Sequence, residues 1–345
     1  MKSSDLKHAV FRADASPTLG VGHISRCLAL ADALYEKGWK CTFVVNRESN
    51  VTYPALSVSS HKVMVPQIPN DPLSVAQVVG GTADLLVVDH YNLDKKFESA
   101  CRGWAESIMV VDDLADRPHD CDFLVDQSIS RTISDYKFLT PISCRILVGP
   151  HYAMLRPEFS RIRQKSLERR NSSQIINRIL VAIGGSDPHD VTTTAIYALM
   201  HCYQNINIDV VLGKNSPNLN KVRNLIFSFR DKIKLHIDTQ KMSELMLNAD
   251  LAIGACGISS WERCTLGLPT IAITIAENQR ENAQSLEKAG AILYSGEWTN
   301  ISENSIVKNL KEIQKNPFLL EKMSLSSRKI CNGKGISRII NSVLS

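Results

Sequence analysis

His23 is the side chain best suited to chemistry in the first part of this 345-residue sequence. It follows two glycines, Gly20 and Gly22, in a turn that opens with Asp14 and Ser16. An imidazole titrates near neutral pH and can accept a proton from water or from a hydroxyl. Glycines let the backbone approach a ligand closely. The alternative is a polar residue in the first turn of a surface helix, but the gathering of these residues in one turn favours a ligand site.

Two elements must position this turn. Residues 8–11 form an apolar run with strand character, and a helical pattern follows the glycines. Ligands of open parallel sheets bind at the carboxyl ends of strands, and unpaired N–H groups at the start of a helix favour an anion. The helix is predicted from apolar positions three or four apart, namely Ile24, Cys27, Leu28, Ala31, Leu34 and Tyr35.

A second group of residues suited to ligand binding lies later in the chain. Gly254 and Gly257 follow an apolar run, and Ser259 and Ser260 then enter a helix. Backbone N–H groups and hydroxyls in this order suit a diphosphate. The sequence leaves open which of the two serines meets the phosphate.

Glu262 and Asn278 extend this second group toward a sugar. A carboxylate in the first turn of the helix can accept from both hydroxyls of a ribose. Asn278 follows the next apolar run, where its amide can bind a sugar hydroxyl. The alternative is a glycine turn with an N-capping serine, in which Glu262 only complements the helix dipole. The succession of all these residues favours the ligand site.

The bulk composition narrows the class of protein. The length fits two domains of about 150 residues, and 44% apolar with 22% charged residues is typical of a soluble globular chain. We expect no membrane span and no signal peptide. The net charge of +5 is mild, so we expect no nucleic-acid partner. We interpret the basic run at 161–170 as an exposed helix face, with an anionic ligand or a membrane surface as open alternatives.

The nine cysteines are scattered along the chain without a C-x-x-C pair. Several lie inside apolar runs, where a reduced thiol behaves as a small apolar side chain. This pattern predicts a cytoplasmic location rather than a disulfide framework.

Apolar runs alternate with helical stretches almost from end to end, as expected for parallel strands buried on both faces. Between residues 157 and 177 the composition becomes charged and polar, which we interpret as a helix followed by a linker. We therefore predict an α/β chain of GT-B architecture, with two Rossmann-like domains facing a central cleft. The N-terminal domain spans 1–165 and carries His23, and the C-terminal domain spans 177–325. We expect a C-terminal helix at 326–345 to pack back on the N-terminal domain.

These motifs together resemble the hydrolases that act on a UDP-sugar in pseudaminic acid biosynthesis, the PseG family, which are relatives of the MurG glycosyltransferases. The resemblance covers nearly the whole chain, with matches in order in both halves. The matching motifs are Phe11-Arg-x-Asp14-x-Ser16, Gly20-x-Gly22-His23, Arg26-Cys27, Asp89-His90-Tyr91, Tyr152-Ala-Met-Leu-Arg156, Gly184-Gly185-Ser186-Asp187, and Glu262 through Asn278-Gln279.

The resemblance implies hydrolysis of UDP-2,4-diacetamido-2,4,6-trideoxy-β-L-altropyranose to UDP and the free sugar. Water attacks the anomeric carbon, and neither a metal nor a cofactor is needed. His23 matches the general base, and we expect Asp14 to orient its ring or position the water. The matching residues expected to bind the UDP-sugar are Asp14, Ser16, Gly20, Gly22, Tyr91, Arg156, Gly184, Gly185, Ser259, Ser260, Glu262 and Asn278.

Other functions remain as alternatives. A UDP-sugar glycosyltransferase would use His23 to activate an acceptor hydroxyl, and a hydrolysing 2-epimerase would invert the sugar at C2. A non-catalytic protein that binds nucleotide sugars would not need a positioned histidine. A nicotinamide dehydrogenase is disfavoured because neither glycine turn gives G-x-G-x-x-G. We considered a metal site and interpret its candidates as solvated residues at loops and strand ends: Asp112, Asp113, Asp116, His119, Cys121 and Asp122. The sequence does not set the oligomeric state.

Overall fold

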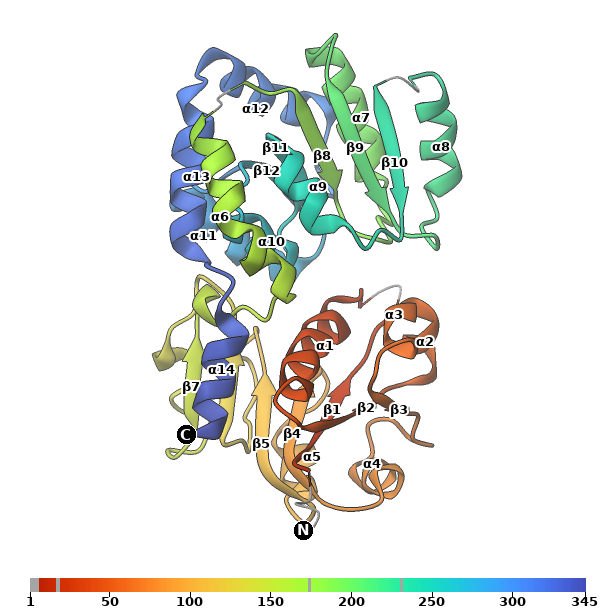
Figure 1. Ribbon diagram of the computed structural model, residues 1–345, viewed down its shortest axis with the longest axis vertical. Helices are drawn as coiled ribbons and strands as arrows, with labels where there is room; N and C mark the ends of the chain where they lie inside the picture. Colours follow the sequence, from red (N-terminus) through yellow and green to blue (C-terminus); the bar gives the residue numbers. More distant parts are fainter. Residues whose placement is uncertain (1–5, 17–18, 173–174, 230–231) are drawn as a thin grey trace. The chain divides into compact units, whose positions relative to one another are not determined.

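The computed structural model describes residues 6–16, 19–172, 175–229 and 232–345 (Figure 1). The chain divides into two compact units. The first unit contains residues 1–156 and 334–345, and the second contains residues 157–333. Each unit is an α/β domain with a parallel sheet, so the predicted pair of Rossmann-like domains is confirmed.

The sheet of the first unit has seven parallel strands in the order β3-β2-β1-β4-β5-β6-β7. The order reverses between β1 and β4, which places a topological switch point at the carboxyl ends of these two strands. The strands are β1 (His8–Ala13), β2 (Lys40–Val44), β3 (Lys62–Met64), β4 (Ala83–Asp89), β5 (Ala105–Val111), β6 (Phe123–Asp126) and β7 (Arg145–Val148).

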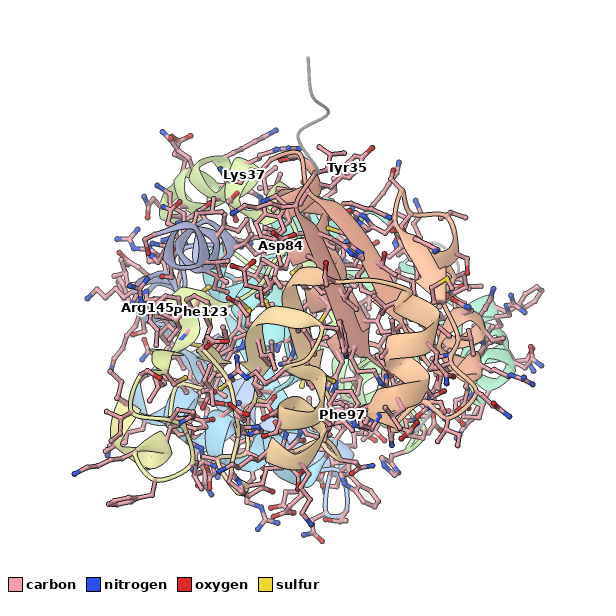
Figure 2. The ribbon with its side chains drawn as sticks, turned by 90° about the horizontal axis from the view of Figure 1, so that it is seen from below. Tyr35, Lys37, Asp84, Phe97, Phe123 and Arg145 are labelled. Carbon is pink, nitrogen blue, oxygen red and sulfur yellow. The ribbon has the colours of Figure 1, made fainter. Side chains whose placement is uncertain are left out.

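The helices of the first unit cover both faces of this sheet. In α1 the predicted apolar positions Ile24, Cys27, Ala31 and Leu34 are buried against the sheet, while Tyr35 at the end of the helix is exposed (Figure 2). The helices are α1 (Gly22–Tyr35), α2 (Arg47–Thr52), α3 (Pro54–Ser57), α4 (Pro72–Val79), α5 (Lys95–Cys101) and α14 (Gly335–Leu344), with 3₁₀ turns η1 (Ile133–Tyr136) and η2 (Pro150–Tyr152).

The sheet of the second unit has six parallel strands in the order β10-β9-β8-β11-β12-β13. Its switch point lies between β8 and β11. The strands are β8 (Arg178–Ala182), β9 (Asn207–Leu212), β10 (Ile233–Ile237), β11 (Leu251–Ala255), β12 (Thr270–Thr274) and β13 (Ile292–Glu297). The helices are α6 (Pro157–Ser172), α7 (Val191–Cys202), α8 (Leu219–Phe227), α9 (Met242–Asn248), α10 (Ser259–Thr265), α11 (Arg280–Lys288), α12 (Glu303–Lys315) and α13 (Phe318–Ile330), with the 3₁₀ turn η3 (Glu277–Gln279).

The basic run at 161–170 is exposed at Arg161 and Lys165, as expected, but not at its other arginines. Arg170 is buried, and its guanidinium donates to the carbonyls of Met246, Ala249 and Leu266 at 2.8, 2.8 and 2.9 Å. Arg163 donates in the same way to the carbonyl of Thr265. These carbonyls end α9 and α10, where backbone acceptors lack helical partners. The run therefore attaches α6 to the second unit, which explains why the division falls after Arg156 rather than at the predicted 165–177.

The last helix returns to the first unit. Ile336, Ile339 and Ile340 of α14 join the same apolar core as α1 and β1. Phe123 and Arg145 lie side by side on β6 and β7 (Figure 2), and Arg145 donates to the carbonyl of Ser342 in α14 at 2.8 Å. Of the predicted segment 326–345, the first residues belong to α13 in the second unit, and the return begins at residue 334. No helix in the described ranges is both long enough and apolar enough to cross a membrane.

Replacing Gly335 with alanine should destabilise the first unit. A Cβ atom at this position would lie 2.2 Å from the carbonyl oxygen of Ala153, and backbone atoms cannot move away cheaply. We expect Gly335→Ala to lower the free energy of unfolding by about 2 kcal/mol, which urea denaturation followed by circular dichroism measures. Gly103→Ala is the control because nothing lies within 4 Å of its added Cβ. Equal midpoints for the two variants would contradict the close approach.

Candidate active site

The turn between β1 and α1 brings four predicted residues together. The backbone N–H of Gly20 donates to the carbonyl of Ser16 at 2.8 Å, and the N–H of Leu19 donates to the Ser16 hydroxyl at 3.0 Å. Gly20 has a φ of +79°, a conformation that side-chain-bearing residues rarely adopt. Gly22 then begins α1, so His23 falls in its first turn.

His23 is 5% exposed and is held through one ring nitrogen. Its Nδ1 lies 3.2 Å from the backbone carbonyl of Asp89 and 3.4 Å from the carboxylate of the same residue. Both are acceptors, so Nδ1 carries the ring proton and the lone pair is on Nε2. No residue in the described ranges forms a hydrogen bond with Nε2. His23 can therefore act as a base through this atom.

Burial keeps His23 neutral, although a carboxylate lies beside it. Burial lowers the pKa of His23; Asp89 acts in the opposite direction, and Arg26 adds to the lowering. Arg26 binds the Asp89 carboxylate with two hydrogen bonds, both 2.6 Å long. Burial alone would raise the pKa of Asp89, but Arg26 and His23 outweigh it and the pKa is lowered. Asp89 is thus an ionised acceptor whose charge Arg26 largely balances.

Tyr91 packs against the ring of His23. The two ring centroids are 4.6 Å apart with an interplanar angle of 79°, an edge-to-face contact. Arg156 is half-buried and ends the first of the two segments, residues 1–156, that form the first unit. Tyr91 therefore lies beside the candidate base, and the ligand roles of Tyr91 and Arg156 stay predictions.

Asp14 does not orient His23, contrary to our expectation. Its carboxylate accepts from Arg12 at 2.7 and 2.8 Å and from the backbone N–H of Asn46 at 2.7 Å. His90 accepts from the N–H of Asn92 through Nδ1, so its Nε2 carries the proton and faces Asp14 at 3.2 Å. Burial would raise the pKa of Asp14, but these donors lower it far below its usual range. Asp14 joins β1 to the segment after β2, and Asp89 has the orienting position.

Sequence reasoning did not assign roles to Asp89 and Arg26, although both lay inside the motifs. Asp89 is the last residue of β4, and Arg26 follows His23 by three positions, so it lies on the same face of α1.

Asp112 and His119 also differ from prediction. They are buried rather than solvated, and they pair with Arg117 at 2.9 Å and Glu98 at 2.8 Å, respectively.

In the second unit the predicted residues gather at the carboxyl ends of β8, β11 and β12, which are neighbours in the sheet. Gly184 and Gly185 are exposed after β8, and a Cβ on Gly184 would contact Ile275 just after β12. A Cβ on Gly257 would likewise contact the side chain of Gln279. Ser259 and Glu262 are half-buried, Ser260 is buried, and Asn278 is exposed.

Sequence reasoning also missed an aromatic pair at this edge. His189 stacks on Trp298 with ring centroids 3.7 Å apart and an interplanar angle of 9°. The loop after β8 carries His189 past β11 and β12 to the end of β13, a contact between residues more than a hundred positions apart that no local pattern signals.

The chain is similar in sequence to several known proteins. Residues 179–341 match the glycosyltransferase family 28 C-terminal domain. The spore coat polysaccharide biosynthesis protein SpsG of Bacillus subtilis is 25% identical over 337 residues, 96% of each chain. A UDP-2,4-diacetamido-2,4,6-trideoxy-β-L-altropyranose hydrolase of Campylobacter jejuni is 25% identical over 285 residues, 81% of this chain and 96% of that protein. An uncharacterized protein of Methanocaldococcus jannaschii is 26% identical over 272 residues, 78% of this chain, which spans only 56% of that longer protein.

Solved structures share the fold at low sequence identity. MurG of Acinetobacter baumannii aligns with a TM-score of 0.66 at 13% identity, covering 98% of this chain and 99% of that one. MnaA of S. aureus, solved with UDP, aligns with a TM-score of 0.63 at 14% identity, covering 98% and 96%. The predicted GT-B fold is thereby confirmed.

At pH 7 the ring of His23 should be neutral with its proton on Nδ1. The reason is that burial lowers its pKa and both neighbours of Nδ1 are acceptors. Ring ¹⁵N chemical shifts followed against pH measure both properties, and His23→Gln identifies the signal. Asp89→Asn should lower the pKa of His23 further, because the anionic charge that favours imidazolium is removed. A ring that is doubly protonated at pH 7, or protonated on Nε2, would contradict this description.

Proposed function

We propose that this chain hydrolyses a UDP-linked diacetamido-trideoxyhexose, UDP-2,4-diacetamido-2,4,6-trideoxy-β-L-altropyranose, to UDP and the free sugar. The observation that carries the proposal is the neutral, buried His23, with Nδ1 held by Asp89 and the Nε2 lone pair available to water. The likeness to the Campylobacter jejuni hydrolase, which covers 96% of that protein, supports the choice of substrate. A cytoplasmic setting, expected from the cysteine pattern, is part of the same proposal.

The first unit supplies the base. His23 Nε2 takes a proton from water while the water oxygen bonds to the anomeric carbon. The bond between that carbon and the phosphate oxygen breaks, and its electron pair leaves with UDP. The proton then resides on Nε2, and the imidazolium is stabilised by the nearby Asp89 carboxylate. UDP is a good leaving group, so holding it and activating one water are the main requirements.

The second unit holds UDP in this proposal. Gly184, Gly185 and one of the pair Ser259 and Ser260 offer backbone and hydroxyl donors to the diphosphate, and Glu262 accepts from the ribose hydroxyls. Asn278 and, in the first unit, Ser16, Gly20 and Gly22 serve the sugar side, with Tyr91 beside the base. The proposed reaction involves neither a metal nor a cofactor.

Transfer to an acceptor is the second candidate. Residues 179–341 match a domain of glycosyltransferases, and the same His23 could deprotonate an acceptor hydroxyl instead of water. The two functions differ only in which oxygen reaches the anomeric carbon. The experiment below therefore follows the origin of that oxygen.

Turnover of the UDP-sugar in H₂¹⁸O without added metal should place the label on the sugar. His23→Gln should lower kcat by about 10²–10⁴, the usual effect of losing a general base. His61→Gln is the matched control, because His61 is a histidine of the same unit that pairs with Asp32. Label on phosphate would overturn the mechanism. Turnover only with an acceptor would support a transferase, and inversion at C2 would support an epimerase.

The pH dependence gives an independent check. The deprotonated form of His23 is the active one, so kcat/KM should rise with pH and level off above the pKa of this residue. Burial places that pKa below the ordinary 6.5, so the rate should already be near its plateau at pH 7. A rate that climbs through pH 7 to 9 would assign the base to another group.

A further inference from the structure

Arg263 in α10 is a buried cation that no carboxylate in the described ranges pairs with. It is 2% exposed, and its Nε has no hydrogen-bond partner in that part of the chain. A buried charge without a counter-charge is costly, and proteins retain one mainly where something else uses it. Burial lowers the pKa of Arg263, and Cys256, Cys264 and Glu262 oppose this only in part.

The guanidinium of Arg263 lies against the turn that joins β11 to α10. Its Nη2 donates to the carbonyl of Ala255 at 2.5 Å and to the hydroxyl of Ser260 at 3.0 Å, and its Nη1 donates to the hydroxyl of Ser259 at 3.0 Å. Gly254 leaves the room for it, since an added Cβ would lie 2.7 Å from Nη1. The glycine that we expected to approach a ligand therefore admits an arginine instead.

These bonds give the two serines different roles. Each hydroxyl accepts from Arg263, so each must direct its own proton elsewhere. Ser260 is buried, and its hydroxyl donates to the carbonyl of Ala255 at 3.4 Å. Ser259 is half-buried, and its hydroxyl has no other partner in the described part of the chain. A hydroxyl that accepts from a cation also becomes a better donor.

Arg170 shows what a purely structural arginine does in the same unit. It is similarly buried and unpaired, but its three donating nitrogens all bind backbone carbonyls. Arg263 instead directs two of its three bonds at side-chain hydroxyls beside the predicted phosphate position. Arg170 therefore caps helices, whereas Arg263 sets the direction in which the serine hydroxyls donate.

We infer that Arg263 is a positioning residue for the diphosphate of a nucleoside diphosphate: it fixes Ser259 as the hydroxyl that donates to phosphate and supplies the buried positive charge beneath it. Ser260 supports the turn rather than meeting the phosphate. This inference rests on the proposed function, because it takes UDP as the ligand.

The affinity for UDP should differ between variants of the two serines. Titration calorimetry with UDP should show Ser259→Ala weakening the Kd about tenfold, and Ser260→Ala weakening it clearly less. Uridine, which lacks phosphate, should bind both variants as it binds the wild type. A larger loss in Ser260→Ala, or no loss in Ser259→Ala while UDP still binds the wild type, would overturn the inference and leave the proposed function standing. A wild type that does not bind UDP would overturn both.

A double-mutant cycle tests Arg263 itself. Arg263→Lys keeps the charge but loses the planar fork, so UDP binding should weaken about tenfold in the wild type and by much less when Ser259 is already alanine. Arg170→Lys is the matched control: its melting temperature should fall, while its Kd for UDP stays within about twofold. Additive effects of the two substitutions would show that Arg263 is structural only. If Arg263→Lys does not fold, the comparison of the two serine variants decides alone.

Discussion

The buried ion pair between Arg26 and Asp89 joins the first helix of the chain to the end of β4, across the point where the strand order reverses. Both side chains are almost fully buried, and two hydrogen bonds of 2.6 Å connect them. Removing one partner of such a pair costs about 3–5 kcal/mol, because it leaves an uncompensated charge. The orientation of His23 follows from this pair, since Asp89 faces Nδ1. Its neutrality follows mainly from burial, which lowers its pKa, and Arg26 limits how far Asp89 favours imidazolium.

The buried arginines of the two units differ in whether a carboxylate balances their charge. In the first unit Arg26 is neutralised by Asp89, so the surroundings of His23 do not attract an anion strongly. In the second unit Arg263 has no partner carboxylate in the described ranges, so its charge remains available to a ligand. In the proposed reaction, this division keeps the base neutral and places the positive charge where the leaving group is negative.

The strands, the two sheets and the position of His23 at the start of a helix could be predicted because they follow from local patterns. Apolar periodicity and glycine turns act over a few residues. The roles of Asp14 and Asp89 could not be predicted in the same way, because both acids end neighbouring strands and only three-dimensional packing decides which one faces the imidazole. The prediction that the basic run is exposed was wrong at Arg170 for the same reason. The carbonyls that Arg170 caps lie 76–96 positions away. The stack of His189 on Trp298 likewise depends on the path of a loop.

The close approach of Gly335 to Ala153 has a consequence for the order in which the chain folds during synthesis. The second unit is one continuous stretch, residues 157–333, while the first is interrupted by it. The apolar core around α1 is incomplete until Ile336, Ile339 and Ile340 leave the ribosome. The second unit can therefore fold before the first is complete. The unit that carries His23 acquires its full core only after residues 157–333 have been translated.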